Sequence, residues 1–153
     1  MTEEASDSAI PAACPKIFGQ DSAVAAFERA LSGNRLHHAW LLAGSKGVGK
    51  ASFAHLATHA LLSGRATLGA AENDAAHARM AAGNEPRLIP LIRTINEKTG
   101  KLRTQISVEQ VRTLRRDLSL SADRGDWRCV IVDAAEDIAS SQAPCQTPKS
   151  SRK

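Results

Sequence analysis

Residues 39–50 read Ala-Trp-Leu-Leu-Ala-Gly-Ser-Lys-Gly-Val-Gly-Lys, an apolar run followed by a glycine-rich turn. An apolar strand, a GxxxxGK turn and a helix in this order are typical of a phosphate-binding loop. The glycines leave room for backbone N–H groups to point at phosphate oxygens, and the following helix adds the positive end of its dipole. We therefore predict a nucleotide site whose loop residues are Gly44, Ser45, Lys46, Gly47, Val48, Gly49, Lys50 and Ala51.

The residue after the loop lysine departs from the motif. Ala51 stands where a phosphate-binding loop has Ser or Thr, whose hydroxyl is the usual magnesium ligand. Ser52 does not replace that hydroxyl, because one position along a helix turns the side chain by about 100°. The loop therefore keeps its phosphate contacts and lacks one metal contact.

A second acidic position completes the candidate site. Residues 130–133 read Val-Ile-Val-Asp, an apolar strand that ends in an acid. We expect Asp133 to face Lys50 across the carboxyl end of the sheet. ATPases of this type place a Glu directly after the acid, but here Ala134 follows, and Glu136 lies about 200° further round a helix.

Phosphoryl transfer depends mostly on positioning and on charge neutralisation around the metal ion. Two groups with these tasks are replaced by alanine, so we expect no fast hydrolysis. Phosphate contacts through the backbone and Lys50 remain, and the residues leave open whether ATP binds.

Size and composition indicate one modest domain with a core. The chain has 153 residues, 42% of them hydrophobic, a net charge of +4 and a pI near 9.3. No apolar stretch reaches membrane-spanning length, and the acidic first residues do not resemble a secretory signal. The scattered cysteines Cys14, Cys129 and Cys145 form no CxxC pair, so we expect no disulfide or zinc framework and a cytoplasmic protein.

Hydrophobic periodicity and turn residues predict an α/β fold with a parallel sheet and helices on both faces. The expected elements are a helix at 21–32, a strand at 36–43, a helix from 51 to about 63, a strand at 88–95, a helix from 107 and a strand at 127–133. A further helix within 65–83 is only weakly indicated. We expect residues 1–14 to be disordered, 15–139 to form the domain, and 140–153 to be a disordered or non-native tail.

Local signals set several of these boundaries. Asp21 is expected to cap the first helix and Gly33 to stop it. Ser107 and Gln110 fit a capping box for the third long helix, with Val108, Val111, Leu114 and Leu118 facing inward. Pro90 makes a central, fully bonded strand position awkward.

Several blocks, in one order along the chain, carry a family resemblance. They are residues 17–21, 35–42, the loop at 44–50, 106–112, 118–120 and 127–133. Together they resemble the delta-prime subunit family of bacterial DNA polymerase III, in the clamp-loader branch of the AAA+ P-loop proteins. The resemblance covers residues 15–139, an incomplete AAA+ domain.

The resemblance implies a subunit of the complex that loads the sliding clamp onto primed DNA. Its partners would be the delta subunit and the ATP-binding tau/gamma subunit, with DNA reached through the complex. Some members of that family do not bind nucleotide, and Ala51 and Ala134 agree with such a scaffold role.

The chain also departs from the resembling family. Residues 64–100 contain no cysteine, so the four-cysteine zinc module of many members is not expected. The arginine-bearing element and the lid and collar domains are not found either. We expect a truncated product, and hypothesise that a reading-frame shift near Ser140 replaced the continuation.

Other interpretations of the residues stay open. The chain could be an active small P-loop ATPase or nucleotide kinase, or a DNA-binding module. Arg112, Arg115 and Arg116 fit a solvated helix face as well as a phosphate or partner contact. His37 and His38 have no further ligand at metal-binding spacing.

Overall fold

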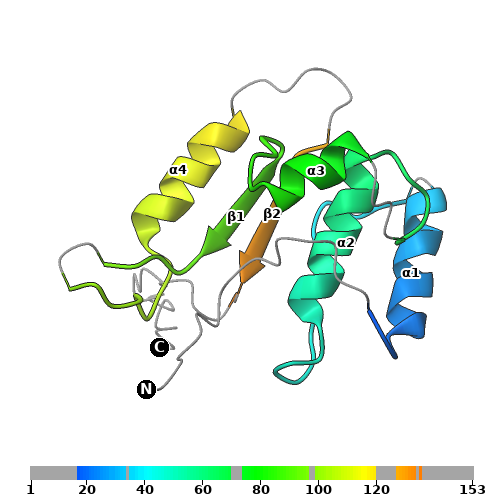
Figure 1. Cartoon of the computed structure of the whole chain (residues 1–153), viewed down its shortest axis with the longest axis horizontal. Coiled ribbons are helices and arrows are strands. Elements are labelled where there is room, and N and C mark those ends of the chain that lie inside the picture. The colour runs from blue at the N-terminus through cyan, green and yellow to red at the C-terminus, as the bar shows by residue number, and fades with distance from the viewer. Residues whose placement is uncertain are drawn as a thin grey trace, which may run out of the picture.

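A two-stranded parallel sheet lies at the centre of the part of the chain that the structure describes (Figure 1). This computed structural model describes residues 17–33, 35–69, 74–96, 99–119, 127–133 and 135. In chain order the elements are α1 (Asp21–Ser32), α2 (Lys50–Leu62), α3 (Ala75–Ala81), β1 (Leu88–Ile92), α4 (Val108–Ser119) and β2 (Cys129–Asp133). Both predicted tails, 1–14 and 140–153, lie outside the described residues.

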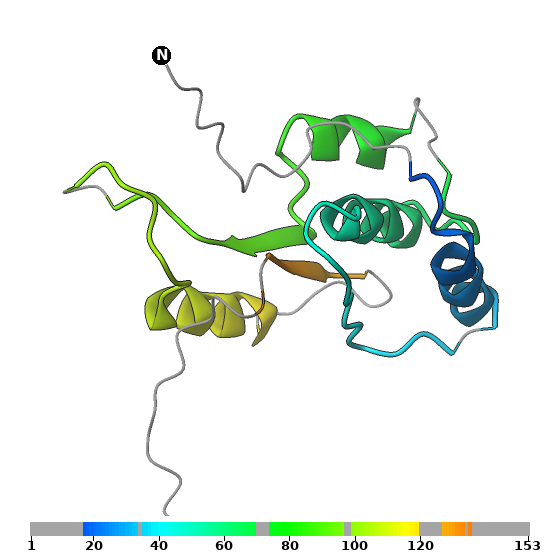
Figure 2. The same cartoon turned by 90° about the horizontal axis from the view of Figure 1, so that it is seen from below.

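The two strands run in the same direction and are joined through α4. Their register pairs Leu88 with Cys129 at one end and Ile92 with Asp133 at the other. Parallel neighbours need a long crossover, and α4 supplies it. Figure 2 shows α4 on one side of the strands and α3 on the other, so the expected parallel sheet with helices on both sides is confirmed for these elements.

Pro90 occupies a position in β1 where its missing N–H costs no ladder bond. The backbone N–H of Cys129 donates to the carbonyl of Arg87 at 2.8 Å. In a parallel ladder, the backbone N–H and C=O groups of every second residue point to the same neighbouring strand. Those of the odd-numbered residues of β1 therefore point to β2, and the backbone of Pro90 points to the outer edge. The Ile92 carbonyl, on that same outer edge, accepts a hydrogen bond from Gln110 Nε2 in α4 at 3.0 Å.

The strand expected at 36–43 is not formed, and this prediction was wrong. The segment is irregular backbone, although Leu36 and Leu42 pack against the cluster around Phe27. The rings of Trp40 and Phe27 pack edge to face with their centroids 5.0 Å apart, while the side chain of Leu41 is 84% exposed. A strand needs a hydrogen-bonded neighbour, and none of the described segments pairs with this one. Figure 2 shows the segment passing α2 on the side away from α3.

The first two helices match their predicted ranges with one correction. Asp21 is the first residue of α1 and not its cap, because Gln20 holds the N-cap position and makes no side-chain capping bond. Gly33 follows the last residue of α1, as expected. α2 ends at Leu62, and the C-cap Ser63 confirms the predicted end.

Two clusters of buried residues form the core, and α2 contributes to both. One joins α1 to α2 and contains Phe27, Phe53 and Ala57. The other joins α2, α3 and β2 and contains Leu62, Ala76, Met80 and Cys129. This second cluster confirms Cys129 as a small core residue, and α2 is consequently buried over most of its length.

α4 starts as predicted but packs less tightly than expected. The capping box is present: Ser107 N donates to Gln110 Oε1 at 2.9 Å, and Gln110 N donates to Ser107 Oγ at 3.3 Å. Three residues of the predicted inward face are half-buried as expected (Val108, Val111 and Leu114), but no residue of α4 is fully buried, and the prediction was wrong for Leu118, which is 44% exposed. The described sheet is only two strands wide, and α4 lies against β1 at its edge.

α3 and β1 each occupy only part of the range predicted for them. α3 occupies part of the 65–83 segment, and β1 ends at Ile92, short of the expected 95. In the described part of the chain, no helix has the length and apolar character needed to cross a membrane.

Candidate nucleotide site

Two glycines give the loop before α2 its shape. Gly49 is the N-cap of α2 and has φ = 95°, a left-handed conformation that costs other residues free energy. Gly44 has φ = 152°, and a Cβ at this position would lie 3.1 Å from Val48 Cγ1. These positions require glycine for conformation or for space, as a tight turn into a helix does.

Hydrogen bonds hold the loop to itself and to the segment before α1. Val48 N donates to Ser45 O at 3.4 Å, closing a turn within the loop. Phe53 N donates to Gly49 O at 2.9 Å as the first turn of α2 forms. Gln20 Nε2 reaches Val48 O at 3.5 Å, so the 17–20 segment lies beside the loop.

Lys50 folds back over the loop that precedes it. Its Nζ donates to the carbonyls of Gly44 at 2.9 Å and Ser45 at 3.0 Å, in an exposed position. The lysine side chain is a compact cation with three donors, so it can also attract an anion. The lysine therefore lies at the positive end of α2, where an oxyanion would be favoured.

The remaining loop residues differ in exposure. Gly44, Ser45, Lys46, Gly47 and Val48 are exposed. Gly49, Lys50 and Ala51 are half-buried. The predicted loop therefore forms one continuous, solvent-accessible turn, and Ala51 presents only a methyl group in the first turn of α2.

Asp133 ends β2 at the end of the molecule where α2 begins (Figure 1). It is half-buried and forms no ion pair with Lys50, whose ammonium is bonded within its own loop. The Asp133 carboxylate interacts electrostatically with His55 of α2. Burial lowers the pKa of His55, and the negative charge of Asp133 partly opposes this by raising it. The structure therefore places Asp133 near the first half of α2 without a direct contact to Lys50.

His55 was not singled out by sequence reasoning. It is only 4% exposed and lies on α2 between the core residues Phe53 and Ala57 in sequence. A histidine within an otherwise apolar helix face was the available signal, but its neighbour Asp133 is distant in sequence. The predicted Ala134 and Glu136 positions lie outside the described residues.

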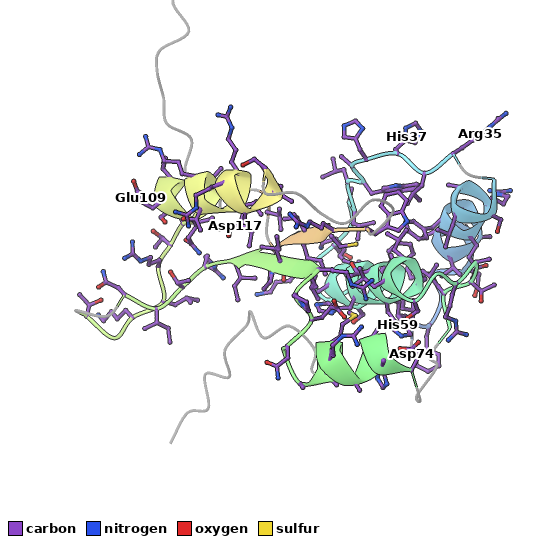
Figure 3. All side chains as sticks on the ribbon, turned by 90° about the horizontal axis from the view of Figure 1, so that it is seen from above. Arg35, His37, His59, Asp74, Glu109 and Asp117 are labelled. Atoms are coloured by element: carbon purple, nitrogen blue, oxygen red, sulfur yellow. The ribbon has the colours of Figure 1, made fainter. Side chains whose placement is uncertain are left out.

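The described residues contain no cluster of three or more His, Cys, Asp or Glu side chains that could hold a metal ion. His37 lies beside Trp40, with ring centroids 6.3 Å apart. Figure 3 shows Arg35 and His37 on the surface segment before the loop. The arrangement can present a helix N-terminus and a lysine to an anion, but no assembled metal site.

Comparison with known proteins gives a match over most of the chain. A family model described as "DNA polymerase III, delta subunit" matches residues 19–144. The match begins just before α1 and continues past β2, so it includes the loop, Lys50 and Asp133. It covers more than half of the sequence.

Two relatives are similar over shorter segments. The DNA polymerase III subunit gamma of Buchnera aphidicola subsp. Acyrthosiphon pisum (strain APS) is 47% identical over 45 residues, which are 29% of this chain and 12% of the relative. The subunit of the same name from Buchnera aphidicola subsp. Schizaphis graminum (strain Sg) is 43% identical over 51 residues, 33% of this chain and 14% of the relative. The matched segments thus span about one eighth of each relative. Because the family model covers α1, the loop, α4 and both strands, the chain belongs to the DNA polymerase III delta subunit family of clamp-loader proteins.

Proposed function

We propose that this chain acts as a scaffold subunit of the delta-prime type in the clamp loader, with a nucleotide site that no longer supports hydrolysis. The family match supports a role in DNA replication through DNA polymerase III. The residues of the loop support the loss of hydrolysis.

The observation that carries this proposal is the combination of Ala51 and Lys50. The methyl group of Ala51 cannot ligate magnesium, and Lys50 is hydrogen-bonded to the carbonyls of its own loop. Phosphate would have to compete with those carbonyls for the ammonium, without a metal ion fixed by the first turn of α2. Such a site favours weak binding over turnover.

The partners follow from the family and are part of the proposal. They are the delta subunit and the ATP-binding tau/gamma subunit, with DNA reached through the assembled complex in the cytoplasm. The two relatives are themselves named gamma subunits, but the matched segments span only 12% and 14% of them.

Equilibrium ATP binding with and without Mg²⁺ tests the nucleotide site. We expect weak or undetectable binding that magnesium does not change, and no turnover. The variant Ala51→Thr restores the hydroxyl and should make any binding magnesium-dependent, whereas Lys50→Ala should abolish it. Tight, magnesium-dependent binding with turnover by the natural sequence would instead establish an active ATPase or nucleotide kinase.

Co-purification with the delta subunit tests the scaffold role separately. We expect the protein to bring down delta whether or not ATP is present, and Lys50→Ala to leave this unchanged. Failure to bind delta under conditions where the protein is folded would overturn the scaffold assignment. The absence of zinc is a separate expectation, which metal analysis of the same sample tests.

A further inference from the structure

A polar cluster outside the nucleotide loop joins the end of α2 to the start of α3. Asp74 is the N-cap of α3, and its Oδ1 accepts a hydrogen bond from His77 N at 2.6 Å. Its Oδ2 accepts from Ser63 Oγ at 2.9 Å and lies 2.9 Å from His59 Nε2. One carboxylate therefore connects three groups from two helices, and Figure 3 shows His59 and Asp74 beside each other between these helices.

The carboxylate of Asp74 can only accept the hydrogen bond that it shares with His59 Nε2. Burial by itself raises the pKa of the Asp74 carboxyl, but the hydrogen bonds from His77, His59 and Ser63 outweigh it and lower the pKa to about 2. An ionised carboxylate only accepts hydrogen bonds, so His59 Nε2 must carry the proton that it donates. His59 Nδ1 is buried and has no hydrogen-bond partner among the described residues, so Asp74 is the one hydrogen-bond partner that the structure shows for this ring.

The other end of α3 is attached by a second carboxylate. Glu85, whose side chain is 1% exposed, accepts from Arg79 Nε at 2.8 Å and from Arg87 Nε at 2.9 Å. Arg79 belongs to α3 and Arg87 directly precedes β1, so Glu85 ties the helix to the sheet. Burial raises the pKa of Glu85, yet the bonds from Arg87 and Arg79 hold it at about 2. Gly83, at φ = 68°, makes the turn between α3 and this anchor.

α3 covers part of the core but is too short to be stable alone. It has seven residues, and isolated helices of that length do not persist in water. Its apolar contacts come from Ala76 and Met80, which pack with Leu62 and with Cys129 of β2. Polar attachments at both ends therefore contribute a large share of what holds α3 against the core.

We propose that α3 is a hinged cover over the sheet, anchored at its C-terminal end by Glu85 and fastened at its N-terminal end by the Asp74 cluster. Opening at the Asp74 end swings the helix about the Gly83 turn and removes Ala76 and Met80 from Cys129, which is 9% exposed when the cover is closed, so reagents reach its thiol more readily. Cys129 serves here as a reporter of the opening. Local opening of this kind requires less free energy than global unfolding.

Alkylation of Cys129 by iodoacetamide measures the opening directly in the full chain. Peptide-resolved mass spectrometry separates Cys129 from Cys14 and Cys145. We expect Asp74→Asn to raise the alkylation rate of Cys129 about tenfold, since the carboxylate bonds to His59 and Ser63 are lost. Ser63→Ala removes one of these bonds and should give a smaller increase in the same direction.

The matched control is Asp21→Asn, the same chemical change at an exposed acid in the first turn of α1. It should leave the Cys129 rate unchanged. A low concentration of urea distinguishes local opening from global unfolding, because local opening exposes little surface and depends weakly on denaturant.

Amide hydrogen exchange on the natural sequence gives an independent readout that does not depend on any variant folding. The amides of α3 should exchange with the same opening free energy as Cys129 alkylation, and faster than those of the buried part of α2. An unchanged Cys129 rate in Asp74→Asn, or α3 amides that exchange only through global unfolding, would overturn the proposal.

Discussion

At the scale of single residues, Gly49 requires glycine for its backbone conformation and not for space. Its φ of 95° is left-handed, yet a Cβ there would meet no atom within 4 Å. Gly49→Ala should therefore destabilise the protein through backbone strain alone, by about 1–2 kcal/mol. Urea denaturation followed by circular dichroism measures this cost.

The control for that variant is Gly33→Ala. Gly33 follows α1 at φ = −81°, so alanine meets no left-handed strain there, although a Cβ would lie 3.0 Å from the Arg29 carbonyl. An equal or larger loss for Gly33→Ala would show that crowding, and not the left-handed conformation, dominates such changes in this protein.

His55 makes the stability of the protein depend on pH. Burial lowers its pKa from 6.5 and Asp133 only partly opposes this, so the unfolded chain takes up a proton before the native state does. Stability should therefore be fully present above about pH 6.5 and decrease as the pH falls below it. His55→Gln should reduce this decrease between pH 7.5 and 5.5 in urea denaturation.

His38→Gln provides the comparison, because His38 is an exposed histidine and is expected to change the pH dependence little. If the two variants show the same slope with pH, the burial of His55 does not govern this part of the titration.

At the residue scale, local signals predicted the loop's turn and the cap of α4, but not the cap of α1, where Gln20 and not Asp21 holds the N-cap position. The glycines, Lys50 and the Ser107–Gln110 capping box are short-range patterns, and the structure forms the turn and the cap from them. The bonds made by Asp74 to α2, and the nearness of His55 to Asp133, join residues far apart in the chain. Neither propensity nor spacing could indicate those contacts.

At the scale of elements, helices were predicted better than strands. A helix satisfies its backbone hydrogen bonds internally, so its periodic pattern suffices to place α1 and α2. A strand depends on a neighbour, and the 36–43 segment shows the consequence. Its apolar side chains pack against Phe27 as a strand's would, but no described segment pairs with its backbone.

The segment leading into α4 contains the most buried large side chain of the described residues, Ile106, which is 0% exposed. Ile106→Ala should lower the free energy of unfolding by about 2–5 kcal/mol, because it leaves a cavity beside the start of a helix that buries none of its own residues. Ile106→Val should cost about 0.5–1.5 kcal/mol.

Chemical denaturation of both variants checks this order. A cost for Ile106→Ala no larger than that for Ile106→Val would mean that the site collapses freely around the smaller side chain, contrary to what its complete burial indicates.

At the scale of the whole molecule, Pro90 influences whether copies of the protein associate. An exposed strand edge with free N–H groups is a template for pairing with another chain. Pro90 faces the outer edge of β1 and offers no donor there. Pro90→Val should supply one and increase self-association, which light scattering coupled to size-exclusion chromatography measures.

Pro90→Lys separates the restored donor from the added apolar surface. It also returns the N–H, but its charge disfavours edge-to-edge pairing. We expect association in the order Pro90→Val, then Pro90→Lys, then the natural sequence. No increase for Pro90→Val would mean that the edge is already blocked by other means, such as the Gln110 bond to Ile92.

Pro90 also affects which edge of the two-stranded sheet can pair with a further strand. On the outer edge of β1, Pro90 offers no donor and the Ile92 carbonyl is already bonded to Gln110, so a further strand pairs more readily with the opposite edge, along β2. A strand added on that flank would lie beside Asp133, the last residue of β2. Any strand that widens the sheet on this side would therefore also change the exposure and the hydrogen-bonding partners of Asp133.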